Sequence, residues 1–139
     1  MTVDAGLGGV LLLVGRVAFG GFLAFAGLNH FLNADQMTGY AASKGIPAPG
    51  FGVIASGAML VLGGLGVLLG VYPVLAAGTL ATFFVVATPT MHDFWAVSDA
   101  ERQSEFTNFT KNVELLGASL VFLALGGQEW AFALGVGVF

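Results

Sequence analysis

Apolar residues lie along this chain in four long runs, which are separated by two polar connections and one tight turn. The runs cover about residues 6–31, 51–71, 74–91 and 109–127. Each approaches the roughly 20 residues that an α-helix needs to cross a bilayer, so the pattern predicts four membrane-spanning helices. Two long connections on one face and a short turn on the other predict an all-α, up-down-up-down four-helix bundle.

The connections differ in length and polarity. Residues 33–50 are polar and end in the helix-breaking sequence Gly-Ile-Pro-Ala-Pro-Gly, and a short interfacial helix is expected within them at 35–44. The turn at Tyr72-Pro73 is minimal, with proline suited to the first position of the next helix. Residues 92–108 are expected to form a charged loop. Because no repeat or linker divides the chain, residues 1–139 are predicted to form one transmembrane domain, which closes with an apolar helical extension or interfacial tail at 128–139.

The composition agrees with a lipid environment. The chain is 57% hydrophobic and 9% charged, whereas soluble domains carry about 25% charged residues. It has no cysteine, which excludes disulfides and cysteine-ligated metal centres. Its net charge of −4 includes only four basic residues, too few for a surface that follows nucleic-acid phosphates. We therefore expect a multi-pass protein of the cell membrane whose first partner is the lipid bilayer.

A stripe of small residues with a charge marks one face of the first helix. Arg16, Gly20, Leu23, Gly27 and His30 are spaced by four, three, four and three residues, so they share one side of an α-helix. At 1.5 Å per residue, Arg16 lies about 15 Å into its helix, near the expected bilayer midplane. An arginine there costs ~2.5–3.5 kcal/mol and should face the protein interior. Two interpretations stay open: a contact for an anion, a quinone carbonyl or a proton, and a structural arginine bonded to backbone carbonyls.

The two histidines end the first and third helices, so an up-down bundle brings His30 and His92 to the same level. They are interpreted either as a proton relay or ligand contacts, or as caps of helix ends. Haem is disfavoured because interhelical haem needs histidines deeper in a bundle.

The fourth helix carries further polar side chains near its start. Asn112 shares a face with Asn108 and Ser119, and an amide at membrane depth usually bonds across helices. Lys111 and Glu114 are three residues apart and are expected to pair locally. Residues 99–105 are expected to be a solvated loop face. The sequence predicts no metal site and identifies no catalytic residue; the candidate ligand-binding residues are Arg16, His30, His92, Lys111, Asn112 and Glu114.

The chain resembles the DoxX family of small four-helix membrane proteins along nearly its whole length. The motifs that carry the resemblance are Arg16 ahead of Ala26-Gly27-Leu28-Asn29-His30-Phe31, Gly45-Ile46-Pro47-Ala48-Pro49, Leu62-Gly63-Gly64-Leu65 with Leu69-Gly70, His92, and Lys111-Asn112. Members of that family are described as subunits associated with terminal quinol oxidase or thiosulfate:quinone oxidoreductase systems. The resemblance implies a quinone-linked redox setting, with quinone as the candidate ligand and membrane oxidoreductase subunits as candidate partners.

Three functions follow from these features. The first is an accessory or quinone-interacting subunit of a membrane oxidoreductase, which holds no redox centre of its own. The second is a non-enzymatic membrane scaffold or assembly factor. The third is a small transporter or channel formed by a homo-oligomer through contacts of Gly66 and Gly70, which form a G-x-x-x-G pair.

Overall fold

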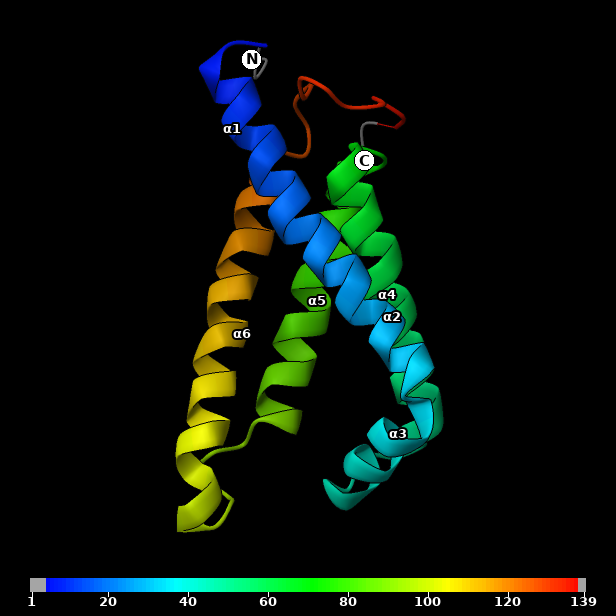
Figure 1. Ribbon diagram of the computed structural model, residues 1–139, viewed down its shortest axis with the longest axis vertical. Helices are drawn as coiled ribbons and strands as arrows, with labels where there is room; N and C mark the ends of the chain where they lie inside the picture. The colour runs from blue at the N-terminus through cyan, green and yellow to red at the C-terminus, as the bar shows by residue number, and fades with distance from the viewer. Residues whose placement is uncertain (1–4, 138–139) are drawn as a thin grey trace.

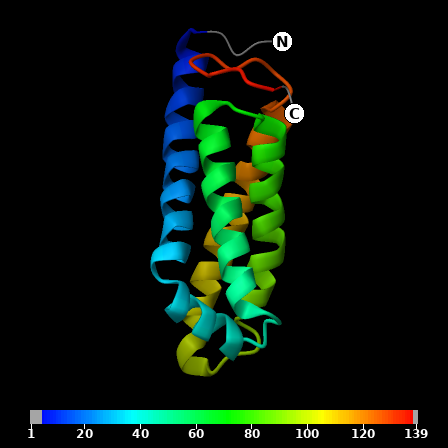
Figure 2. The same cartoon turned by 90° about the vertical axis from the view of Figure 1, so that its right-hand side faces the viewer.

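The computed structural model describes residues 5–137, most of which are helical. Its elements are α1 (Leu7–Arg16), the π-helix η1 (Val17–Gly21), α2 (Phe22–Leu32), α3 (Ala34–Ser43), α4 (Pro49–Leu69), α5 (Pro73–Met91) and α6 (Asp99–Leu125). The first three follow one another without a break, and they lie alongside α4, α5 and α6 in an elongated molecule (Figures 1 and 2). We call the end that holds α3 and the connection between α5 and α6 the loop end. The opposite end, where α1 begins and the segment after α6 lies, is the tail end.

Three helical segments are long and apolar enough to cross a membrane: the continuous Leu7–Leu32, α4 and α5. The longest helix, α6, is not among them, and it carries charged residues from its first turn to Glu114. Large apolar side chains such as Phe22, Leu32 and Phe51 are exposed on the outside. An apolar surface of this extent is unfavourable in water and suits lipid.

The charged loop predicted at 92–108 is shorter than expected, because α6 begins at Asp99 rather than near 109. The prediction missed a capping sequence. Ser98 precedes the helix and its hydroxyl donates a hydrogen bond to the Glu101 carboxylate at 2.8 Å, and Ser-x-x-Glu is a signature of a helix start. The two acidic residues of the first turn, Asp99 and Glu101, also favour the helix dipole. Other predicted boundaries were closer, and the short helix expected at 35–44 is α3.

The small-residue stripe on the first helix faces inward as predicted. Arg16, Gly20, Leu23 and Gly27 are buried, and His30 is half-buried. The glycines let two backbones approach, because a Cβ at Gly20 would lie 2.5 Å from the Gly64 carbonyl oxygen of α4. Close backbone contact of this kind is how small residues hold membrane helices together.

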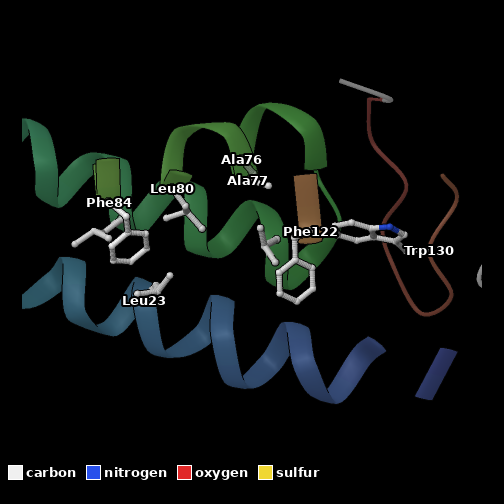
Figure 3. Close-up of a cluster of buried hydrophobic side chains, with 9 residues drawn as sticks. Leu23, Ala76, Ala77, Leu80, Phe84, Phe122 and Trp130 are labelled. Atoms are coloured by element: carbon white, nitrogen blue, oxygen red, sulfur yellow. The ribbon is translucent and has the colours of Figure 1, made fainter. Parts of the chain in front are cut away.

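The main apolar core joins the continuous first helix to α4, α5 and α6 (Figure 3). Leu80 of α5 and Val67 of α4 are fully buried in it. On α4, Gly63 and Gly66 admit α5, since a Cβ at Gly66 would lie 2.5 Å from the Ala76 Cβ. The remaining members of the core cluster are Leu23, Leu60, Ala76, Ala77, Phe84, Phe122 and Trp130.

The proposed oligomer contact through Gly66 and Gly70 is occupied by the chain itself. Gly66 packs against α5, and Gly70 ends α4 with a positive φ of 67° next to Ala133 of the C-terminal segment. Residues that are packed this closely within the chain do not present a face to a second copy.

After α6, the chain turns back across the tail end as an irregular segment rather than as a helical extension (Figure 1). It is held by hydrogen bonds from Leu134 N to Leu69 O at 2.8 Å and from Tyr72 N to Val136 O at 2.7 Å. The indole of Trp130 donates to Leu125 O at 2.9 Å and so caps α6. We call residues 126–137 the tail.

Candidate functional site

Arg16 lies at the tail end, where its fully buried side chain binds backbone carbonyls of two segments. Its Nε donates to Val67 O at 3.1 Å, and one terminal nitrogen donates to Leu68 O at 2.7 Å and to Phe132 O at 3.3 Å. The other terminal nitrogen donates to Ala131 O at 2.9 Å. Four hydrogen bonds therefore engage most of the five N–H groups of this guanidinium.

These contacts complete the C-terminal end of α4. A helix leaves its last four carbonyls without intrahelical donors. In α4, Gly66 O accepts from Val71 N and Leu69 O accepts from Leu134 N, while Arg16 serves the two carbonyls between them. The positive guanidinium also favours the negative end of the helix dipole. Arg16 is thus a structural arginine that caps α4 and ties the tail to it.

The surroundings of Arg16 are separated from the histidines. Its guanidinium carbon lies 5.3 Å from the centre of the Trp130 ring, in cation–π geometry. Although it is in the middle of its own helix, Arg16 lies level with the last turn of α4, because α1 extends beyond α4 (Figure 1). Along the helix axis His30 is about 21 Å away, at 1.5 Å per residue. The predicted ligand residues Arg16 and His30 therefore lie toward opposite ends of the molecule.

His30 lies at the loop end and binds α4. Its Nδ1 is 2.9 Å from the Ser56 hydroxyl and 3.3 Å from Val53 O. The ring also meets Phe83 of α5 edge to face, with centroids 6.4 Å apart. His30 is half-buried and joins α2 to α4. The partner of His92, Glu105, lies on α6 instead.

His92 follows α5 and belongs to a network of hydrogen bonds at the loop end. Its Nδ1 lies 2.8 Å from one carboxylate oxygen of Glu105 on α6, and the Tyr40 hydroxyl of α3 donates to the other oxygen at 3.0 Å. Beside this chain, the Lys44 ammonium binds Asp93 at 2.6 Å. We call these five residues, Tyr40, Lys44, His92, Asp93 and Glu105, the loop-end network. It ties α3 to α6 and to the end of α5.

Electrostatics hold the loop-end network in its charged form. Burial raises the pKa of Glu105, but the hydrogen bonds from His92 and Tyr40 outweigh it and leave this pKa below its usual value. The Lys44 ammonium lowers the pKa of Asp93 by hydrogen bonding, and burial raises the pKa of Tyr40. Burial lowers the pKa of Lys44, but the hydrogen bond to Asp93 and the interactions with Tyr40, Asp93 and Glu105 together outweigh burial and leave this pKa above its usual value. Near neutral pH two carboxylates, an ammonium, a phenol and an imidazole therefore lie within one hydrogen-bonded group.

Aromatic side chains pack next to the network. Phe94 meets Trp95, Phe106 and Phe109 edge to face, with ring centroids 5.1 to 5.2 Å apart. Trp95 is more than half exposed, which suits the bilayer interface expected for it.

The predicted residues of α6 divide between its two faces. Asn112 is buried, and so is Ser119 two turns further along α6. The face that the sequence predicts these residues to share therefore points inward. Lys111 and Glu114 are exposed, and the ion pairs found within residues 5–137 involve neither of them.

Of the five residues of the loop-end network, sequence reasoning singled out only His92 and missed Tyr40, Lys44, Asp93 and Glu105. Glu105 was interpreted as loop because the helix start at Ser98 was not recognised, and Tyr40 lies on α3, whose docking against α6 no local pattern reports. The capping sequence Ser98-Asp99-Ala100-Glu101 was the available signal. It would have placed Glu105 on the same helix face as Asn108 and Asn112.

Comparison with known proteins gives one finding. The model of a protein family described as DoxX matches residues 11–93, which include Arg16, His30 and every member of the loop-end network except Glu105. No curated protein and no solved structure matches the chain.

Proposed function

Because the chain belongs to the DoxX family of membrane proteins, we propose that it is a multi-pass protein of the cell membrane that acts as a quinone-interacting accessory subunit of an oxidoreductase system. In this proposal α6 is the fourth membrane crossing and completes an up-down-up-down four-helix bundle. Its charged first turns lie at the interface, and its apolar part from about residue 109 crosses the lipid.

The observation that carries the proposal is the hydrogen-bonded chain Tyr40–Glu105–His92 at the loop end. Its side chains come from three segments, α3, α6 and the residue after α5. The side chains of His92 and Glu105 are 23% and 14% exposed, so they are partly desolvated and still reachable from the bilayer interface. A quinone carbonyl accepts hydrogen bonds, and the donor for it is His92 Nε2 when that nitrogen carries a proton, since Tyr40 already donates its hydroxyl hydrogen to Glu105.

In this proposal the chain exchanges the protons that quinone reduction and quinol oxidation require. Reduction of a quinone to a quinol takes up two electrons and two protons. A histidine paired with a carboxylate at the membrane face is suited to exchange those protons with water, because its ring nitrogens can both take up and release a proton. The electrons come from a partner oxidoreductase subunit. This chain would bind the headgroup and supply or accept the protons.

The other predicted ligand residues differ in how close they lie to the proposed binding site. His30 lies at the same end of the molecule and lines the approach from α2 and α4. Arg16 is assigned a structural role, since its donors already bind carbonyls at the opposite end. Asn112 lies deeper on α6, whereas Lys111 and Glu114 face outward.

Quinone binding by purified protein in lipid nanodiscs tests the proposal. A saturable affinity for a short-chain quinone is expected, and Glu105→Gln should weaken it by about tenfold, since loss of a charge-assisted hydrogen bond costs roughly 1.5 kcal/mol. Arg102→Ala is the matched control, because Arg102 lies on the same helix in an exposed pair with Asp99. Absence of saturable binding, or equal affinities in all three proteins, would refute the proposal.

A scaffold or assembly role is the second candidate, favoured by a separate surface. An open apolar groove of about 500 Å³ runs between α4 and α5, with Met59, Leu62, Leu69, Leu75 and the small residues Gly63 and Ala76 in its lining. A scaffold would keep its partner when His30 and His92 are both replaced by alanine. Loss of the partner on those substitutions would instead favour the quinone-linked role.

A further inference from the structure

Two buried polar side chains lie on α5 and α6 just inside the loop-end network. The helices are antiparallel, and three contacts set their register: Val74 with Gly126, Gly78 with Leu123, and His92 with Glu105. Interpolation between these contacts places Thr88 of α5 within one turn of Asn112 on α6. Both are more than nine-tenths buried, at 5% and 8% exposed.

Thr88 has an unusual environment for a hydroxyl in an apolar interior. Its Oγ1 is buried and has no hydrogen-bond partner among the residues that the structure describes. Other threonines of α5 bond the carbonyl one turn back, as Thr82 does with Gly78 O at 2.8 Å. A buried hydroxyl without a partner costs about 1–3 kcal/mol. Because Thr88 does not reach the Asn112 amide directly, a third group must bridge them if that cost is to be avoided.

We propose that Thr88 and Asn112 form an internal water-binding site. A water molecule needs only a cavity of about one probe sphere and two to four polar partners. The Thr88 hydroxyl and the Asn112 amide supply both donors and acceptors.

The site extends the loop-end network inward. Thr88 precedes His92 by one turn, about 6 Å along the helix, and Thr88 O accepts the backbone N–H of His92 at 3.1 Å. On α6, the half-buried Asn108 lies between Glu105 and Asn112 on the inward face. Water at Thr88 and Asn112 would therefore continue the polar path from the bilayer interface into the helix interior. A role of this water in proton transfer rests on the proposed quinone function, whereas the water site itself does not.

Water-edited solid-state NMR of the full chain in lipid bilayers tests the site. Magnetisation from water should reach the side-chain amide of Asn112 and the methyl of Thr88, and the isosteric Thr88→Val should abolish most of the transfer to Asn112. Thr82→Val is the matched control on the same helix, and should leave the transfer unchanged. No transfer to Asn112 in the unsubstituted protein would overturn the proposal.

Thermal unfolding provides a second test, in which the two possible outcomes shift the unfolding midpoint in opposite directions. Thr88→Val should lower the unfolding midpoint by several degrees if the hydroxyl binds water, since the substitution leaves Asn112 and the water with fewer partners. A raised midpoint would mean that valine removed an unpartnered hydroxyl, and would overturn the water site. Quinone binding is measured separately, so its failure with intact water transfer would refute only the proposed function.

Discussion

The two ends of this molecule use charge in different ways. At the tail end, one buried cation, Arg16, binds only backbone carbonyls and an aromatic ring. At the loop end, two carboxylates, an ammonium and a histidine pair with one another and remain partly exposed. The guanidinium stays charged at any physiological pH, whereas carboxylate and imidazole groups exchange protons.

This difference separates a structural role from a chemical one. A charge far from water usually signals function in a membrane protein. Here the mid-helix arginine instead satisfies the last carbonyls of a neighbouring helix, which in lipid have no water to bind. The hydrogen-bonded groups that can change their charge, Glu105, Asp93 and His92, lie at the opposite end. Each prediction below tests one side of this contrast.

Arg16→Ala should have the largest effect, a loss of about 3–5 kcal/mol in the free energy of unfolding, because several buried carbonyls lose their donor together. Chemical unfolding in detergent measures it, and hydrogen exchange should show the tail released. Arg16→Lys should be intermediate, since a single ammonium cannot reach both segments in the geometry of the guanidinium fork. Wild-type stability and a protected tail in Arg16→Ala would show that the cap contributes nothing.

Gly20→Ala tests the close approach that lets Arg16 reach α4. Its new Cβ would lie 2.5 Å from Gly64 O, and overpacking of this kind costs about 1–3 kcal/mol. Gly21→Ala is the control, since a Cβ at the next residue meets nothing within 4 Å. Equal unfolding free energies for the two variants would contradict the packing.

Glu105→Gln should have a smaller and more local effect at the loop end. The amide keeps one acceptor but loses the charge that binds His92, so we expect a loss of about 1 kcal/mol. Hydrogen exchange should rise in α3, which Tyr40 ties to this carboxylate, and stay unchanged in the tail. Faster exchange across the whole molecule would mean that the network supports the global fold.

Mild acid should have the smallest of these effects, a loosening that is confined to the loop end. The pKa of Glu105 in the folded protein lies below its ordinary value of 4.5, so its contribution is present above that value and is lost as the pH falls through the lower folded pKa. Lys44 has the opposite sign: its raised pKa gives stability that is lost only at high pH, above its ordinary value of 10.5. The protection factors of α3, which correct for the intrinsic pH dependence of exchange, should therefore fall as the pH approaches about 4, while those of the tail stay constant.

The inward face of the first helix could be predicted because it depends on local spacing. Arg16, Gly20, Leu23 and Gly27 follow the helical period, and all four are buried. The partners of Arg16 could not be predicted, because two of them, Ala131 and Phe132, lie more than a hundred residues away in an irregular segment. No periodicity describes such a segment, and the docking of Tyr40 on Glu105 is equally non-local.

The proposed quinone binding at the loop end can be tested most directly with the two tryptophans of the chain, one at each end. Trp95 lies beside the loop-end network and Trp130 lies against Arg16. In nanodiscs, Trp130→Phe leaves only the loop-end reporter and Trp95→Phe only the tail-end reporter. We expect saturable quenching by a short-chain quinone for Trp95 alone, and Glu105→Gln should raise the quinone concentration at half-saturation by about tenfold. Saturable quenching of Trp130, or of neither tryptophan, would contradict the assignment of structure to one end and chemistry to the other.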